Sequence, residues 1–224
     1  MSHRLSRRAL KSAFLLLLSA CASAGPPKTI AVAPGSGIMT GSEEQRRALA
    51  TADSAARAFA PADVDFMQGM IPHHAQAVKM ARWAKLNGAR SDLRILCGRI
   101  DIAQTDEIRM MRRWLAERRQ DVPDSTAMRH VMKMANGATH EVMMPGMLSD
   151  AEMAALEKAR GSQFDRLFLT GMIRHHRGAI DMVNELFNHG NAGHDDTVFR
   201  FAADVVSDQT AEIQVMLRML DTVP

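Results

Sequence analysis

The feature that most constrains the fold of this chain is an internal repeat. Residues 63–80 and 165–182 share the pattern Asp-x-x-Phe-x-x-Gly-Met-Ile-x-His-His-x-x-Ala-x-x-Met, and matched residue numbers differ by 102 throughout. A second match follows with a three-residue slip: Gln-x-x-Glu-Ile-x-x-Met occurs at 104–111 and again at 209–216. Because each copy needs a neighbour to cover its apolar face, each half predicts a helix pair. Two pairs predict a four-helix bundle whose motif helices are related by a pseudo-twofold axis.

The sequence around the repeats also favours helices. Ala, Leu, Glu, Arg and Met dominate from Ser42 onward, and Tyr is absent. The predicted helices cover residues 43–59, 62–87, 91–119, 149–160, 163–188 and 195–221. Residues 120–148 form a Met-rich connection, and Ser149 with Glu152 makes a capping-box pattern that starts the next helix. The predicted fold class is therefore all-α, a four-helix bundle with extra short helices.

The N-terminus predicts export. A basic stretch precedes an apolar run over 13–20 that is too short to span a membrane, as in a secretory signal. The run ends in Leu18-Ser-Ala-Cys21, which resembles a lipobox and predicts lipidation of Cys21; the alternative is an uncleaved anchor with an incidental cysteine. The predicted organisation is a signal over 1–21, a flexible tether over 22–42 and a helical domain over 43–224. Within that domain, repeat one covers 60–119, the connection 120–148 and repeat two 149–221.

Export changes the charge balance of the chain. The full sequence has 28 basic and 25 acidic residues, and removal of the four basic residues of the signal leaves 24 against 25. This balance does not support a basic surface for nucleic acid. Lipidation of Cys21 leaves Cys97 without a partner, so Cys97 is predicted to be a buried helix residue and the core to depend on packing.

The histidine pairs of the repeat are the strongest candidates for a ligand site. Adjacent residues on a helix diverge by about 100°, so His73 and His74 cannot both point into one small site. One member of each pair faces inward and the other flanks it, or each serves a separate site. Met70 and Met80 lie on the same side of the helix as His73, and the second half offers the same arrangement.

Histidine with methionine points to a soft or borderline transition metal. Imidazole binds copper, zinc, nickel and iron, whereas thioether selects for Cu(I). The chain holds 18 methionines, a high density, although methionine also fills irregular gaps in apolar cores. We therefore predict copper, as Cu(I) or Cu(II), with zinc or iron as alternatives. The predicted ligands are His73, His74, His175, His176, Met70, Met172, Met80 and Met182.

Four carboxylates are candidates for supporting this site. Glu107 and Glu212 each follow a glutamine by three residues in the partner helices. They either hydrogen-bond the second nitrogen of a motif histidine, and so orient it, or face solvent. Asp63 and Asp165 lie near the start of each motif helix, where helix capping is the plainer role and support of the metal site the alternative.

The sequence favours binding over catalysis. It contains no Gly-rich phosphate loop, no nucleophilic serine elbow and no Cys-x-x-Cys pair. One alternative is a structural or interaction lipoprotein that binds no metal. A ferritin-like redox enzyme is disfavoured, because Met70 and Met172 stand where di-iron proteins need glutamate. The expected partners are a metal ion, a membrane through the lipid anchor, and a metal-transfer protein or a second copy of the chain, but no nucleic acid.

The repeated motif, together with Met144-Pro-Gly-Met-Leu-Ser-Asp150, resembles the family called domain of unknown function 305. The resemblance covers about residues 60–221. It implies a ferritin-like four-helix bundle in bacterial, commonly exported proteins, some of which are linked to copper binding and copper resistance in the periplasm. For this chain, the resemblance implies copper binding only by the eight predicted ligands, which match the family motif. The family lacks a settled activity, so the resemblance implies more about fold than about function.

Overall fold

The computed structural model describes residues 42–43, 45–47, 59–124, 130–133 and 139–224. The predicted signal with Cys21, nearly all of the tether and most of the helix predicted over 43–59 lie outside these residues. The region from residue 43 to residue 224 forms one compact unit. Within the described part of the chain, no helix is both long and apolar enough to cross a membrane.

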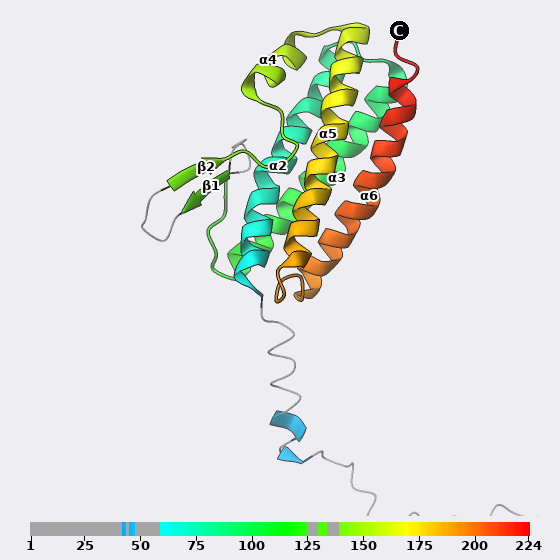
Figure 1. The fold of residues 1–224 in the computed structure, drawn as a ribbon. Coiled ribbons are helices and arrows are strands. Elements are labelled where there is room, and N and C mark those ends of the chain that lie inside the picture. Colours follow the sequence, from blue (N-terminus) through cyan, green and yellow to red (C-terminus); the bar gives the residue numbers. More distant parts are fainter. Residues whose placement is uncertain (1–41, 44, 48–58, 125–129, 134–138) are drawn as a thin grey trace, which may run out of the picture. The chain divides into compact units, whose positions relative to one another are not determined.

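Four long helices form the body of the domain (Figure 1). They are α2 (Pro61–Leu86), α3 (Ser91–Glu117), α5 (Gly161–Asn188) and α6 (Asp196–Leu220), and the short α4 (Asp150–Lys158) precedes α5. Helix α2 packs against α3 and helix α5 against α6, so each repeat forms one helix pair. The predicted helical fold class is confirmed, and the five predicted helices after residue 60 agree with the structure to within a few residues.

Local sequence signals account for the helix ends. After α2, Gly88 adopts a φ of +71°, which allows the Ala89 N–H to donate to Ala84 O at 3.0 Å and close the last turn. Before α4, the predicted capping box is present. The Ser149 N–H donates to Glu152 Oε2 at 2.8 Å, and the Glu152 N–H donates to Ser149 Oγ at 3.3 Å.

The connection between α3 and α4 contains a small two-stranded sheet in addition to the predicted helices. Strand β1 (His130–Lys133) pairs antiparallel with β2 (Thr139–Val142), with His130 opposite Val142. Strands of four residues are too short for alternating polarity to be recognised in the sequence. The hairpin lies beside α2 in Figure 1, and β1 contacts that helix.

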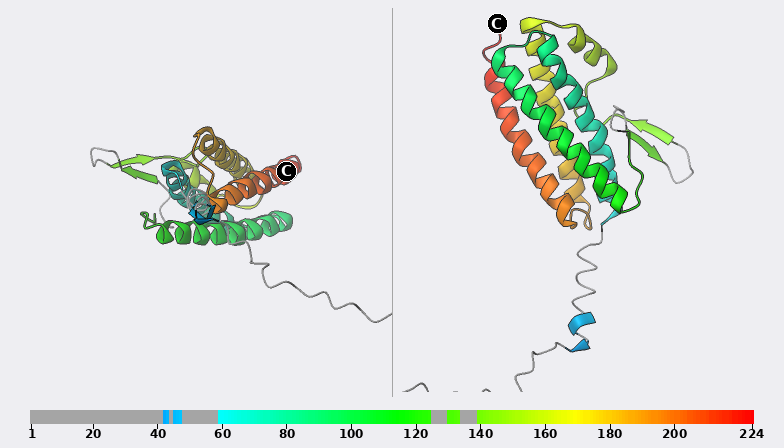
Figure 2. Two further views of the ribbon diagram at one scale, coloured as in Figure 1. Left: turned by 90° about the horizontal axis from the view of Figure 1, so that it is seen from below. Right: turned by 180° about the vertical axis from the view of Figure 1, so that it is seen from behind.

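Helices α2 and α5 form an antiparallel pair with the symmetry of the repeat (Figure 2). A Cβ atom on Gly69 would lie 3.4 Å from Met182 Cε, and one on Gly171 would lie 3.5 Å from Met80 Cε. The repeat exchanges these two contacts, since Gly69 corresponds to Gly171 and Met80 to Met182. The centre of the helix crossing therefore lies midway between them, at the two His-His pairs, as a pseudo-twofold axis requires.

The apolar core is divided into two clusters, one toward each end of the bundle. Phe164 and Phe168 belong to the first cluster, with residues from the second half of α2 and the first half of α3. Phe66, the repeat equivalent of Phe168, belongs to the second cluster with Phe201. Cys97 is buried in the first cluster as predicted, and burial raises the pKa of its thiol. The histidine pairs lie at the level between the two clusters.

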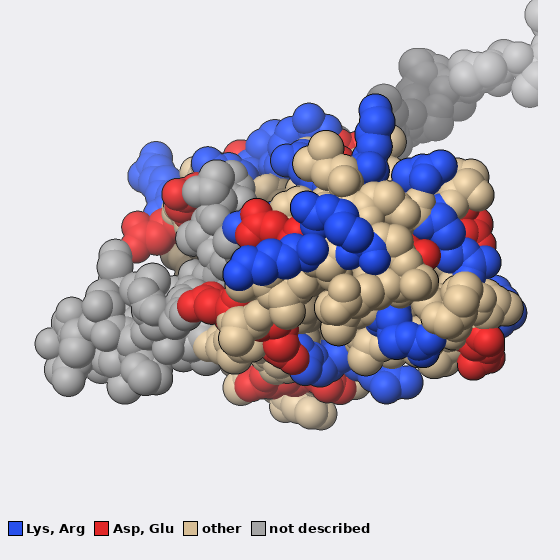
Figure 3. Space-filling model, turned by 90° about the horizontal axis from the view of Figure 1, so that it is seen from above, with Lys and Arg blue, Asp and Glu red and all other residues tan. Residues whose placement is uncertain are grey.

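The surface at one end of the bundle is predominantly basic. Figure 3 views the molecule from the end at which α2 finishes and the C-terminus lies, and Lys and Arg cover more of this face than Asp and Glu. Two arginines hold the C-terminal residues. Arg90 Nη1 donates to Thr222 Oγ1 at 2.8 Å, and Arg166 Nη2 donates to Pro224 O at 2.9 Å.

Candidate metal centre

The two His-His pairs lie in the middle of α2 and α5 and are completely buried. The exposed fraction is 0 % for each of the four residues, His73, His74, His175 and His176. At this height α2 and α5 are covered by each other and by their partner helices. Neighbouring residues that diverge by about 100° can therefore both point into the interior.

His73 and His175 point toward each other across the α2–α5 interface. Their ring centroids are 3.8 Å apart, with an interplanar angle of 42°. Within each pair the rings are further apart, at 6.3 Å for His73–His74 and 6.2 Å for His175–His176. One histidine of each half thus meets its counterpart at the pseudo-twofold axis, and the other turns toward the outer helices.

The outward-turning histidines each meet a glutamate. His74 Nε2 lies 2.9 Å from Glu107 Oε2 of α3, and His176 Nε2 lies 2.7 Å from Glu212 Oε2 of α6, the second with hydrogen-bond geometry. The Glu107 and Glu212 side chains are 24 % and 23 % exposed. A carboxylate acceptor favours a proton on Nε2, so the Nδ1 of the same ring is the nitrogen left for another ligand.

His73 is held by a backbone carbonyl. Its Nε2 lies 3.0 Å from Pro145 O, and because a carbonyl oxygen can only accept, Nε2 carries the hydrogen. Burial, followed by the charge of His74, lowers the pKa of His73 to about 3, so the ring is neutral at pH 7 and its Nδ1 is a free lone pair. Burial and the neighbouring His73 also lower the pKa of His175 well below its ordinary value.

Nearly all unsatisfied polar atoms of the interior belong to the four motif histidines and to one glutamine in each partner helix. Among the described residues, Arg118 Nε is the single buried, unpartnered side-chain nitrogen or oxygen that lies elsewhere. The others are His73 Nδ1, both nitrogens of His74, both nitrogens of His175, His176 Nδ1, Gln104 Oε1 and Gln209 Oε1. Of these, His74 Nε2 has Glu107 Oε2 at 2.9 Å, but without hydrogen-bond geometry. Each such atom costs about 1–3 kcal/mol if it stays unpaired. A cluster of this size is typical of a place that a bound ion or ordered water fills.

The four predicted methionines lie in the apolar clusters on either side of the histidine layer. Met70 and Met182 belong to one cluster, and Met80 and Met172 to the other. All four are buried, with Met182 the most exposed at 7 %. From the rise of a helix, Met70 and Met172 lie about 4.5 Å along the axis from the nearest motif histidine, and Met80 and Met182 about 9 Å. The first two are therefore the better placed thioethers.

Asp63 and Asp165 connect the two halves of the bundle at its ends. Asp63 accepts from Ala60 N at 2.8 Å and from Gly193 N, in the α5–α6 loop, at 2.6 Å. The Arg90 N–H, at the start of α3, points at both oxygens of Asp165 at 3.3 and 3.4 Å. These contacts are made with backbone amides and not with the motif histidines. Asp63 caps the start of its own helix, whereas Asp165 accepts from the residue that precedes α3.

The segment 144–148 covers the histidine layer, and its contacts were not predicted from the sequence. Gln76 Nε2 donates to Leu148 O at 3.0 Å, and the Leu148 N–H donates to Gln76 Oε1 at 2.7 Å. On the other side, Gly178 permits close approach of the segment, because a Cβ atom there would collide with Pro145 O. Gln76 and Gly178 occupy equivalent positions of the two repeats. The difference in residue type at this position was the feature of the sequence that could have indicated the contact with the segment.

The donor set suits a soft metal better than a hard one. Within the described ranges, no three His, Cys, Asp or Glu side chains converge on one point as a ready-made site. The layer instead offers imidazole nitrogens, with thioether sulfurs on the adjacent turns. Copper accepts both of these donors, whereas magnesium and calcium require oxygen. The residues present therefore fit copper.

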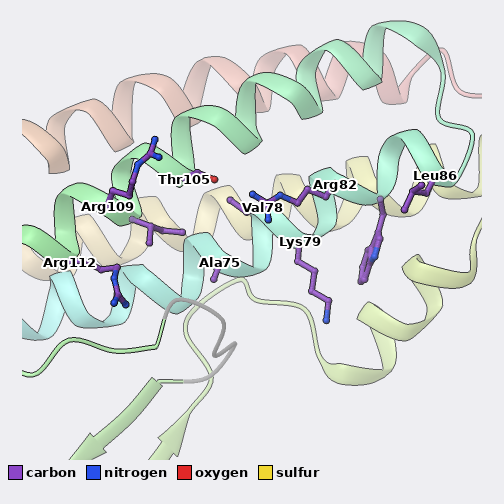
Figure 4. Close-up of a pocket in the computed structure, with 10 residues that line it drawn as sticks. Ala75, Val78, Lys79, Arg82, Leu86, Thr105, Arg109 and Arg112 are labelled. Carbon is purple, nitrogen blue, oxygen red and sulfur yellow. The ribbon is translucent and has the colours of Figure 1, made fainter.

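A different kind of hollow lies on the outer surface between α2 and α3 (Figure 4). Its volume is about 700 Å³, and its apolar wall includes Trp83 and Ile108. The basic side chains that line it are Lys79, Arg82, Arg109 and Arg112. Arg82 pairs with Asp101 at 3.0 Å, and Arg109 pairs with Asp106. The lining of this hollow offers no carboxylate, imidazole or thioether group to a metal cation.

Comparison with known proteins identifies the family. The family model described as "Domain of unknown function (DUF305)" matches residues 63–220. The chain belongs to the DUF305 family. No curated protein matches this DUF305 chain.

Solved structures of related proteins support the same assignment. A DUF305 fragment from Deinococcus radiodurans is 31 % identical, with a TM-score of 0.59, over 73 % of this chain and 97 % of that one. A DUF305 protein from Streptomyces coelicolor is 28 % identical, with a TM-score of 0.59, over 71 % and 92 %. CopM in its Cu(I)-bound form is 27 % identical, with a TM-score of 0.54, over 71 % and 95 %. Structures of CopM also exist in Cu(II)-bound and silver-bound forms.

Proposed function

We propose that this protein binds copper in the buried histidine layer and sequesters it or passes it to a partner, without turnover. The observation that carries the proposal is the gathering of unpartnered imidazole nitrogens at the centre of the bundle. His73 and His175 are in contact there, and low pKa values keep both rings neutral, the form that binds metals.

The methionines favour copper over zinc and iron. Met70 and Met172 lie one helical turn before His73 and His175, and thioether is a ligand that Cu(I) prefers. The related CopM has been crystallised with Cu(I), Cu(II) and silver, and silver resembles Cu(I) as a soft cation. We assign the ligand set to the four histidines with Met70 and Met172, and Met80 and Met182 to the surrounding shell.

The N-terminal sequence supports a place in the cell envelope. The signal-like stretch and Cys21 in its lipobox-like setting suit an exported protein that a lipid holds at a membrane. Copper bound at such a surface could pass to a second protein or to another copy of this chain. Mass spectrometry of the protein from its native envelope would show an acylated Cys21 as the first residue.

The substitution His175→Leu tests the copper site most directly. Neither ring nitrogen of His175 makes a hydrogen bond of good geometry, so leucine removes a ligand at little cost in hydrogen bonding. We expect copper affinity to fall at least tenfold, measured by chelator competition, while the thermal stability of the metal-free protein stays the same or rises. His189→Gln changes an exposed histidine and serves as the control. Equal copper affinity in His175→Leu and the unaltered protein would refute the proposal.

A structural role without metal is the second candidate, and the hydrogen bonds of the layer favour it. His73 bonds to Pro145 O and His176 to Glu212, so both histidines connect separate elements of the fold. If this is their whole function, the purified protein takes up no copper, and His176→Leu destabilises it by about 2 kcal/mol or more, because Glu212 loses its partner.

A further inference from the structure

Two hollows open between α3 and α6. The right-hand view of Figure 2 shows these two helices side by side. The first has a volume of about 700 Å³, and Glu107 of α3 and Phe201 and Asp204 of α6 are among its lining residues. The second has a volume of about 360 Å³ and is lined in part by Leu96 of α3 and Glu212 of α6. Glu107 and Glu212 are repeat equivalents, so each half contributes one glutamate to one hollow.

Each glutamate connects its hollow with a buried histidine. About a quarter of each carboxylate side chain is exposed, whereas His74 and His176, within 2.9 and 2.7 Å of them, are completely buried. Buried atoms without partners lie nearby. Gln104 Oε1 and Gln209 Oε1 are unpaired one helical turn before Glu107 and Glu212, and each glutamine is less than 5 % exposed. These oxygens and the free imidazole nitrogens are groups that attract a cation.

The charge lining the first hollow is negative. Its charged residues are Asp106, Glu107, Asp196 and Asp204 against Arg113 and Arg200, and Asp106 is also paired with Arg109. In the second hollow Asp92 is paired with Arg90, so Glu212 and Arg99 are the remaining charged residues of its lining. The carboxylates also act on one another. Burial and the charges of Asp204, Glu107 and Glu212 raise the pKa of Asp208, which places these four groups within electrostatic reach.

The other surfaces are less suited to the approach of a cation. The hollow between α2 and α3 is lined by four basic side chains (Figure 4). The end of the bundle in Figure 3 carries more Lys and Arg than Asp and Glu. The segment 144–148 covers the histidine layer on its remaining side, held by Gln76 and packed on Gly178. On the α3–α6 side, each hollow has a partly exposed carboxylate in direct contact with a buried ring.

We propose that Glu107 and Glu212 are two access points at which a metal cation is captured from solvent and transferred to His74 or His176, and from there to the His73–His175 contact. This inference rests on the proposed copper function and adds the route by which the ion reaches the buried histidines. The carboxylates act as positioning residues that attract and guide the ion, and the histidines hold it. The pseudo-twofold symmetry provides the same route from each half of the bundle.

The test compares rates of copper uptake in the double variant Glu107→Gln/Glu212→Gln. Glutamine keeps the size of the side chain and an oxygen that accepts from the histidine, but it removes the charge. The full-length protein is mixed with Cu(II) chloride in a stopped-flow instrument, and quenching of the Trp83 and Trp114 fluorescence is followed. Asp101→Asn is the control, because it removes one charge from α3 on the side that faces Arg82.

We expect uptake by the double variant to slow on the order of tenfold, a typical loss when electrostatic steering is removed. Its copper stoichiometry at equilibrium should be unchanged, and its rate should depend less on ionic strength than that of the unaltered protein. An uptake rate equal to that of Asp101→Asn overturns the route, as does a loss of stoichiometry, which would make the glutamates permanent ligands. Absence of uptake by the unaltered protein contradicts the copper function itself.

Discussion

At the scale of single residues, the two copies of the motif differ in ways that serve as internal controls. Met67 and Leu169 are equivalent, and both are completely buried. The same fold therefore accepts either side chain at this position. Met70 and Met172 are methionine in both copies and lie one turn before His73 and His175. If the site requires sulfur, replacing Met70 and Met172 with leucine should weaken metal binding, whereas replacing Met67 should not. If these methionines serve only packing, both replacements should have the same small effect.

The first prediction follows from this contrast. The double substitution Met70→Leu/Met172→Leu should lower the affinity for Cu(I) by at least tenfold, because it removes the two thioethers that lie one helical turn before His73 and His175. Its cost in stability should remain below about 1.5 kcal/mol, since the volume is nearly conserved. Met67→Leu is the matched control and should leave Cu(I) affinity unchanged. Anaerobic chelator competition measures the affinities, and equal values for all three proteins would assign the methionines to packing alone.

At the scale of elements, the histidine layer depends on a segment outside the four long helices. The 144–148 segment reaches across α2 and α5 and places Pro145 O against His73 Nε2. This bond fixes which nitrogen of His73 carries the hydrogen and leaves Nδ1 free. Gly178 is required because the backbone of Pro145 and Gly146 occupies the space of a Cβ atom. The two halves of the site are therefore not identical, although the motif is.

A prediction at this scale concerns Gly178→Ala. The methyl group must displace Pro145, so the variant should lose about 1–3 kcal/mol of stability and the hydrogen bond to His73. Gly98→Ala is the control, because nothing lies within 4 Å of a Cβ there. That control should gain about 0.5–1 kcal/mol from the helix preference of alanine. Urea denaturation measures both changes, and a neutral Gly178→Ala would show that the segment is not tightly docked.

At the scale of the whole molecule, two buried aspartates join the repeats at opposite ends of the bundle. Asp63 of the first half bonds to Gly193 of the second, and Asp165 of the second half meets Arg90 of the first. The repeats are thus reciprocally connected. The Asp63 bonds are shorter, and its side chain is completely buried.

We predict that removing the Asp63 side chain lowers the free energy of unfolding more than removing that of Asp165. Asp63→Ala leaves two backbone amides unpaired and should cost about 2–3 kcal/mol of the free energy of unfolding, whereas Asp165→Ala should cost about 1 kcal/mol. The two sites are far apart, so the costs should add in the double variant. Copper stoichiometry should be unchanged, since neither residue contacts a histidine. A double variant that loses copper while remaining folded would place the aspartates in the metal site.

The sequence by itself determined the helical class, the helix limits and the duplication. These features are local or periodic: Ser149 with Glu152 caps α4 through neighbouring residues, and a repeat is visible without coordinates. The 100° step between adjacent residues also required each His-His pair to diverge. The tertiary structure alone decided that His73 meets His175, that Glu107 and Glu212 reach His74 and His176, and that Pro145 holds His73. These contacts join residues more than thirty positions apart, and their geometry depends on how the helices cross. The short hairpin was likewise not predictable, because its pairing gives no periodic signal in the sequence.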